Sequence, residues 1–144
     1  MRATLLLPAL LLVAAALGSC GAASAITSPP AATSGDAVLA KAFADHADGL
    51  EVQGQGTVQK LLSDDVSGER HQRFIVELAS GQTLLLAHNI DVAHRVPGLQ
   101  VGDTVAFKGE YVWNAQGGLV HWTHRDPSGS HAAGWIKYQG KTYQ

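Results

Sequence analysis

The sequence predicts a mainly β protein: a small barrel of five strands with one helix in front of it. From Leu50 onward, apolar and polar residues alternate with a period of two in several short segments, which is typical of strands with one buried face. These segments form a group of three and a group of two, separated by a long irregular connection at 88–100. The first segment also contains glycines, which suit a strand that bends to close a barrel.

The first 19 residues are typical of an export signal. Arg2 gives a short positive start, an uncharged apolar run follows at 5–17, and Leu17-Gly18-Ser19-Cys20 resembles the lipobox of bacterial lipoproteins. The run is too short to span a bilayer comfortably. Cys20 is the only cysteine, so it has no partner for an internal disulfide, and lipidation accounts for it. We predict a lipoprotein-type signal at 1–19 and a membrane anchor on Cys20, which places the protein in the bacterial envelope, facing the periplasm or anchored in the outer membrane.

An alternative processing site is Ala23-Ser24-Ala25, whose small residues fit ordinary signal cleavage. Cleavage after Ala25 would give a soluble periplasmic or secreted protein. The small, uncharged residues at 20–35 indicate a flexible tether. A helix is expected at 36–49, with apolar residues on one face and Gly49 at its end, and the barrel domain at 50–144.

The strands follow from the alternation and from the turns between them. We expect five strands, at 51–62, 71–78, 83–87, 104–113 and 119–124, and a hairpin-like tail at 134–143. The continuous apolar run at 83–87 suggests a strand buried on both faces. The arrangement of three strands followed by two matches the OB-fold, a small, partly open Greek-key barrel. A small SH3-like barrel and an open β-sandwich are the alternatives.

Composition excludes several classes of function. Without Arg2 and the rest of the signal, the formal charge is about −3, which gives no general attraction to nucleic acid. The acidic pair Asp64-Asp65 also disfavours binding to nucleic acid. The sequence contains no Gly-rich phosphate loop, nucleophile elbow, Cys-His dyad or paired zinc cysteines.

The stretch GGLVHWTHRDPSGSH (117–131) contains three of the seven histidines. The spacing of His121 and His124 resembles a metal-binding motif. In a strand, however, two residues separated by an odd number of positions point to opposite faces. A simple zinc interpretation of this pair therefore fails unless a bulge intervenes.

The residues that follow offer a different geometry. Asp-Pro-Ser-Gly at 126–129 has the preferences of a type I turn. A hairpin closed by this turn would place His124 opposite His131, with Cβ atoms roughly 4.5–5.5 Å apart and Trp122 on the same face. Such a pair, with His121 as a further ligand, would hold a zinc-like divalent metal or act as general acid and base. The alternative is two surface histidines beside a tryptophan, with no ligand.

Trp122 and two further groups are candidate ligand-binding residues. Trp122 is a candidate for exposure, where its ring could stack on a base or a sugar. His71, Arg73 and Glu77 share the outer face of the second strand, which belongs to the usual ligand surface of an OB-fold. The alternative is a solvated strand face. His88 and Asp91 follow a buried strand, where polar side chains either cap the loop or contact a ligand.

Three stretches together resemble a family of small exported bacterial proteins known only as a domain of unknown function. They are GERHQRFIVELASGQTLLLAHNIDVA, GDTVAFKGEYVWNAQGGLVHWTHRDP and GWIKYQGKTYQ, and the resemblance covers roughly residues 50–144. It implies an OB-like barrel and assigns no catalytic or binding residue. The family pattern is expected to have Pro at the position of His94, so His94 is a poor candidate for shared chemistry.

The sequence therefore predicts a non-catalytic OB-fold binding or accessory module that is tethered to the envelope. Its expected ligand is a small molecule, a glycan or a protein rather than nucleic acid. The alternative is a metal-dependent hydrolase, of the phosphodiesterase kind, that uses a histidine cluster around His124 and His131.

Overall fold

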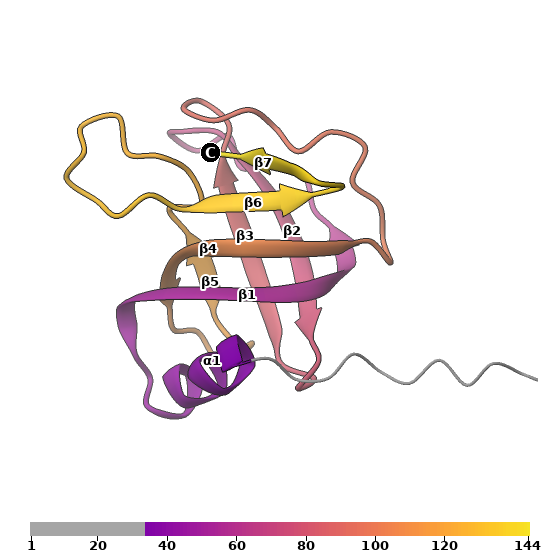
Figure 1. Ribbon diagram of the computed structural model, residues 1–144, viewed down its shortest axis with the longest axis vertical. Helices are drawn as coiled ribbons and strands as arrows, with labels where there is room; N and C mark the ends of the chain where they lie inside the picture. The colour runs from indigo at the N-terminus through magenta and orange to yellow at the C-terminus, as the bar shows by residue number, and fades with distance from the viewer. Residues whose placement is uncertain (1–33) are drawn as a thin grey trace, which may run out of the picture.

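The computed structural model describes residues 34–144, which form one N-terminal helix, a closed five-stranded barrel and a C-terminal hairpin (Figure 1). The elements are α1 (Ser34–Ala44), β1 (Asp48–Leu61), β2 (His71–Leu78), β3 (Thr83–Asn89), β4 (Thr104–Val112), β5 (Leu119–His121), β6 (Trp135–Tyr138) and β7 (Lys141–Tyr143). The predicted export signal, the anchor residue Cys20 and most of the predicted tether lie outside the described residues.

The five barrel strands follow the order β1-β2-β3-β5-β4, and β4 closes the barrel by pairing with β1. All of these pairs are antiparallel except β3 with β5, which run parallel. Three meandering strands followed by a hairpin that returns beside the third strand give the Greek-key connection of the OB-fold. The predicted OB-like barrel is confirmed.

The long strand β1 pairs with two other strands of the barrel, β2 and β4. Gly56 lies opposite Leu78 of β2 and also opposite Val105 of β4. The register then shifts between Val58 and Lys60, as at a β-bulge. The sequence predicted a bend in this glycine-containing first strand. The bend lets β1 pair with both β2 and β4.

The core lies inside the barrel and follows the alternation of the strands. Phe74, Val76 and Leu78 of β2 face inward, as predicted. The prediction that the third strand is buried on both faces was wrong, because Leu84 and Leu86 are buried while Leu85 between them is only half-buried. A strand in a small barrel has a single inner face, so its outer face stays close to solvent.

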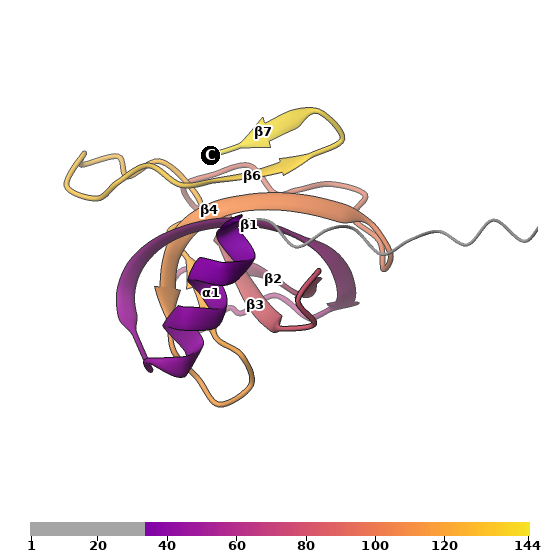
Figure 2. The same cartoon turned by 60° about the horizontal axis from the view of Figure 1, so that its bottom comes forward.

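Helix α1 lies at one end of the barrel, where it covers the core (Figures 1 and 2). Leu39 and Ala42 are its buried apolar residues. The helix begins two residues before the predicted start and ends at Ala44 rather than at 49. It ends early because His46 has a positive φ of 54°, which the right-handed helix does not allow.

The segment after β5 also departs from the prediction. The fifth strand ends at His121 rather than at His124, because Trp122 has a φ of 52° and leaves the extended conformation. The chain then makes a loop at 122–134 and returns as β6, which pairs with β4 and forms a hairpin with β7 (Figure 1). This hairpin is the predicted tail.

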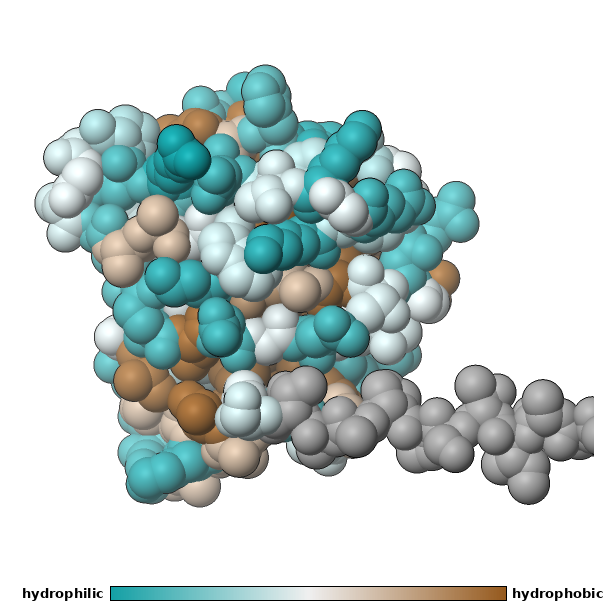
Figure 3. Space-filling model, viewed as in Figure 1, coloured by the Kyte–Doolittle hydropathy of each residue, from teal (hydrophilic) through white to brown (hydrophobic). Residues whose placement is uncertain are grey.

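The visible surface is mainly polar around the 122–134 loop, at the upper left of Figures 1 and 3. Apolar atoms gather instead near α1, at the lower left of Figure 3, and Val38 of α1 is 47% exposed. Within residues 34–144, no helix has the length and hydropathy needed to cross a membrane.

Candidate functional site

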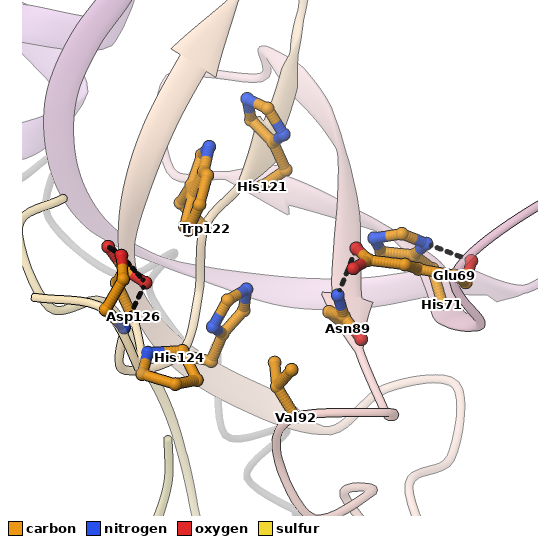
Figure 4. A pocket seen from close by; sticks show the side chains of 10 residues that line it. Glu69, His71, Asn89, Val92, His121, Trp122, His124 and Asp126 are labelled. Atoms are coloured by element: carbon orange, nitrogen blue, oxygen red, sulfur yellow. Dashed lines mark hydrogen bonds between the residues drawn. The ribbon is translucent and has the colours of Figure 1, made fainter. Parts of the chain in front are cut away.

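A hollow of about 530 Å³ opens where β3 and β5 end and β2 begins (Figure 4). These ends meet because β3 and β5 run parallel and His71 at the start of β2 pairs with Asn89 at the end of β3. The lining residues are Glu69, His71, Asn89, Val92, His121, Trp122, His124, Asp126, Pro127 and Ser128. His121, Trp122 and His124 lie on one side of the hollow, and Glu69, His71 and Asn89 lie across from them (Figure 4).

The wall formed by β2 and β3 is a connected polar group. The Asn89 amide donates to Glu69 Oε2 over 2.7 Å, and Asn89 Oδ1 accepts from the backbone N–H of Asp91 over 2.9 Å. His71 Nδ1 lies 2.9 Å from the Glu69 carbonyl oxygen. The lining contains two carboxylates and neither Lys nor Arg. The hollow therefore favours a neutral or cationic ligand over a phosphate.

The opposite wall is built around Trp122. Its ring stacks on His131, with centroids 4.3 Å apart and an interplanar angle of 7°. The His124 ring contacts the same indole at 5.3 Å, tilted by 34°. The backbone turn at Trp122 brings His121 and His124 to the same hollow, so the prediction that these rings point to opposite faces was wrong.

Asp126 organises the loop that follows. Its carboxylate accepts hydrogen bonds from the backbone N–H groups of Ser128, Ser130 and His131, at 2.9, 2.7 and 2.9 Å, and from both serine hydroxyls. The Ser128 hydroxyl and these other donors hold the pKa of Asp126 far below its ordinary value. The Gly129 N–H donates to the Asp126 carbonyl, so the predicted turn at 126–129 is present.

The hairpin expected around this turn does not form. The carboxylate of Asp126 gathers the following amides and curls the chain, so no strand flanks the turn. The His124 carbonyl accepts from Gly134 N–H instead of facing His131 across a ladder. His124 is buried, with Nδ1 2.7 Å from the Arg125 carbonyl. The predicted cross-strand pair of His124 and His131 was therefore wrong.

His131 instead meets two glutamates of the barrel, and we call Glu51, Glu110, His121 and His131 the Glu–His cluster. In the register, Glu51 of β1 lies opposite Glu110 of β4, and Glu110 lies opposite His121 of β5. His131 Nε2 is 2.9 Å from Glu110 Oε2 and 3.6 Å from Glu51 Oε1. His121 Nε2 is 3.3 Å from Glu110 Oε1. Lys108 Nζ lies 4.0 Å from the second oxygen of Glu51.

The charges of the Glu–His cluster depend on one another. Two carboxylates directly opposite each other in a sheet repel. The hydrogen bond to Glu110 raises the pKa of His131, and the same bond is the main cause of a lowered pKa at Glu110. A positive charge between Glu51 and Glu110 therefore stabilises this cluster. The carboxylate oxygens of these two residues and His131 Nε2 form one set of atoms suited to hold a metal.

His88, a predicted ligand-binding residue, is fully buried. Its Nδ1 lies 2.9 Å from the Thr123 hydroxyl and its Nε2 lies 3.0 Å from the His94 carbonyl. Burial lowers the pKa of His88 to about 4, so the ring is neutral at pH 7. His88 thus connects β3 to the chain after β5 and does not line the hollow.

The other predicted ligand residues do not converge. Arg73 donates from Nε and Nη2 to the Ser63 carbonyl and so holds the loop between β1 and β2. Asp91 accepts from the backbone N–H and Nε of Arg70, both at 2.7 Å. Glu77 pairs with Thr83 near the end of β2 that is remote from His71. Of the six predicted ligand-binding residues, only His71 and Trp122 line the hollow.

Sequence reasoning missed the carboxylates Glu51, Glu110 and Glu69 and the amide of Asn89. A local signal existed, because Glu110 occupies an outward position of a clearly alternating strand. Nothing in the sequence indicated that Glu51 is the partner of Glu110, because the two residues meet only through the register of β1 with β4.

A family model described as a protein of unknown function, DUF3465, matches residues 21–144. The chain belongs to DUF3465. This confirms the resemblance to an uncharacterised family, and the barrel of this chain fits the OB-like fold that the resemblance implies. No curated protein matches the chain.

Proposed function

We propose that this DUF3465 chain is a non-catalytic binding module, tethered to the envelope through Cys20, that holds a small polar ligand in the hollow beside Trp122. The observation that carries the proposal is the hollow itself, which combines an indole, three imidazoles and an amide at one edge of the barrel. It adjoins β2, β3 and the loop between β1 and β2, the region where OB-folds bind their ligands.

The lining indicates the class of ligand. The lining contains Glu69 and Asp126 but neither Lys nor Arg, so the hollow has no permanent positive charge to balance a phosphate. This argues against nucleotides as ligands. Trp122 supplies an apolar surface, while His71 and Asn89 supply hydrogen-bonding groups, a combination that orients a ligand with both kinds of surface. We propose a neutral glycan as the ligand.

The test is a ligand screen by thermal shift and tryptophan fluorescence on the purified chain. Neutral oligosaccharides are expected to raise the melting temperature and to change the emission of Trp122, whereas nucleotides are not. His71→Ala should weaken binding about tenfold, because a hydrogen-bonding wall residue is lost. His94→Ala is the matched control, since the exposed His94 lies outside the lining.

The outcome that contradicts this proposal is a screen in which no glycan binds, or in which His71→Ala binds as tightly as the unsubstituted chain. Stabilisation by nucleotides alone would also overturn the assigned ligand class. The alternative of a hydrolase built on a His124–His131 pair gains no support from the geometry, because that cross-strand pair does not form.

A further inference from the structure

The Glu–His cluster lies on the outside of the barrel, and of its four residues only His121 also lines the hollow proposed to bind a glycan. Glu51, Glu110 and His121 form a row across three neighbouring strands, β1, β4 and β5. Each of these side chains is partly exposed, by 37%, 24% and 33% respectively. The 122–134 loop places His131 over this row, and the side chain of His131 is 18% exposed.

We propose that Glu51, Glu110 and His131 bind one divalent transition-metal ion of the zinc class, with His121 holding the second oxygen of Glu110. This inference goes beyond the proposed function and does not depend on which ligand occupies the hollow.

The spacing of the donor atoms fits a metal. Around a tetrahedral zinc with bonds of about 2.0–2.2 Å, neighbouring donor atoms are roughly 3.3–3.6 Å apart. His131 Nε2 lies 2.9 Å from the nearest oxygen of Glu110 and 3.6 Å from that of Glu51. All three donor atoms lie within 4.8 Å of one another. Small side-chain rotations therefore suffice to admit an ion.

The orientation of His131 gives a second, independent argument. Its Nδ1 lies 2.8 Å from the Ala132 carbonyl, which can only accept, so Nδ1 carries a hydrogen and donates it. Nε2 consequently faces Glu51 and Glu110. A backbone carbonyl on one ring nitrogen, with the other nitrogen turned toward anionic donors, is the usual arrangement of a metal-binding histidine.

The ring of His131 is also held in place before any ion binds. It stacks on Trp122, and the backbone N–H of His131 donates to Asp126 Oδ2 over 2.9 Å. Asp126 fixes the preceding residues of the loop through Ser128 and Ser130. Binding therefore does not require ordering of the loop, which favours affinity.

The donor set indicates the class of ion. Two carboxylates balance the charge of a divalent cation, and an imidazole suits zinc, iron, copper or nickel better than calcium or magnesium. Three protein ligands leave a coordination position for solvent. His121 Nε2, at 3.3 Å from Glu110 Oε1, orients the carboxylate as a positioning residue.

The test is a titration of the purified chain with zinc chloride, measured by calorimetry. The Cys20→Ala variant is used because it lacks the only thiol of the chain. One zinc ion per chain is expected, with micromolar or tighter affinity. Cobalt chloride should give visible d–d absorption of the same stoichiometry. Glu51→Gln and His131→Ala should each weaken binding by at least about tenfold, and His121→Ala by about tenfold to a hundredfold.

Glu77→Gln and His94→Ala are matched controls, since neither residue belongs to the Glu–His cluster, and they should bind zinc as the parent does. Circular dichroism establishes that each variant is folded. Glu51→Gln changes only one partly exposed carboxylate, so it keeps the test valid even if His131→Ala unfolds. Absence of zinc binding, or zinc binding that Glu51→Gln leaves unchanged, would overturn the proposal.

Discussion

At the scale of single residues, the surroundings of each side chain decide its role more than its type does. The chain has seven histidines, and the structure places His88 in the core, His131 against carboxylates and His46 on Trp113 with ring centroids 4.1 Å apart. Only environment separates these roles, because an imidazole is a donor, an acceptor or a cation according to its neighbours.

His88 leads to a prediction about pH. Its folded pKa of about 4 is below the unfolded value of 6.5, so between these values the unfolded chain binds the proton and the folded chain does not. His88 therefore lowers the free energy of unfolding as pH falls from 6.5 to 4, by about 3 kcal/mol in total, and has no effect above 6.5. NMR titration of the His88 ring should give a midpoint near pH 4. A midpoint near 6.5 would contradict this assignment.

Asp126 leads to a second prediction at this scale. Asp126→Ala removes the acceptor for the backbone N–H groups of Ser128, Ser130 and His131. These three amides should therefore exchange hydrogen much faster, while amides of the barrel strands keep their protection. Hydrogen exchange followed by NMR measures both. Unchanged protection at His131 would mean that other contacts hold the loop.

At the scale of elements, the short strand β5 decides where His121 and Trp122 lie. It has three residues, and it reaches β4 closely because Gly109 carries no side chain. A Cβ added at Gly109 would lie 2.2 Å from the His121 carbonyl oxygen, nearer than atoms can approach. The glycine thus allows the backbone contact on which both the hollow and the Glu–His cluster depend.

The corresponding prediction is that Gly109→Ala destabilises the chain by about 3 kcal/mol, since β5 must move away from β4. Gly129→Ala is the control: φ there is 71°, but nothing lies within 4 Å of an added Cβ, so the cost is about 1 kcal/mol. Urea unfolding at pH 7 measures both. Equal losses for the two variants would show that the close approach at Gly109 is unimportant.

At the scale of the whole molecule, a closed barrel is joined to an N-terminal region that the sequence predicts to be an export signal and a tether. α1 begins the described part at Ser34 and covers one end of the barrel, while the hollow lies at the ends of β3 and β5. A lipid on Cys20 would hold this barrel near a membrane.

The prediction at this scale concerns Cys20. In cells grown with labelled palmitate, the chain should incorporate lipid, and Cys20→Ala should abolish the incorporation because no other thiol is present. Mass spectrometry of the mature N-terminus checks the same point. A mature chain that begins at Ile26 without lipid would show that cleavage follows Ala25 instead.

The sequence by itself determined the fold class and most of the strands. Alternation in β2 and β4 is a local pattern, and inward residues such as Phe74 and Phe107 can be recognised without knowledge of their partners. The turn at 126–129 was predictable for the same reason, since Asp, Pro and Gly act on adjacent peptide units. Arg73 and Asp91 form hydrogen bonds with neighbouring loops, and nothing in the sequence pattern indicated these partners. Their predicted role in ligand binding stays a prediction.

Only the tertiary structure decided which side chains meet. Glu51 and Glu110 lie far apart in the sequence, and the register of β1 with β4 places them side by side. His131 reaches them because Trp122 turns the chain with a positive φ and Asp126 curls the loop, and neither conformation is fixed by residue type. Registers and loop paths depend on the free energy of the whole packed barrel, whereas strand periodicity depends only on which face of each segment is buried.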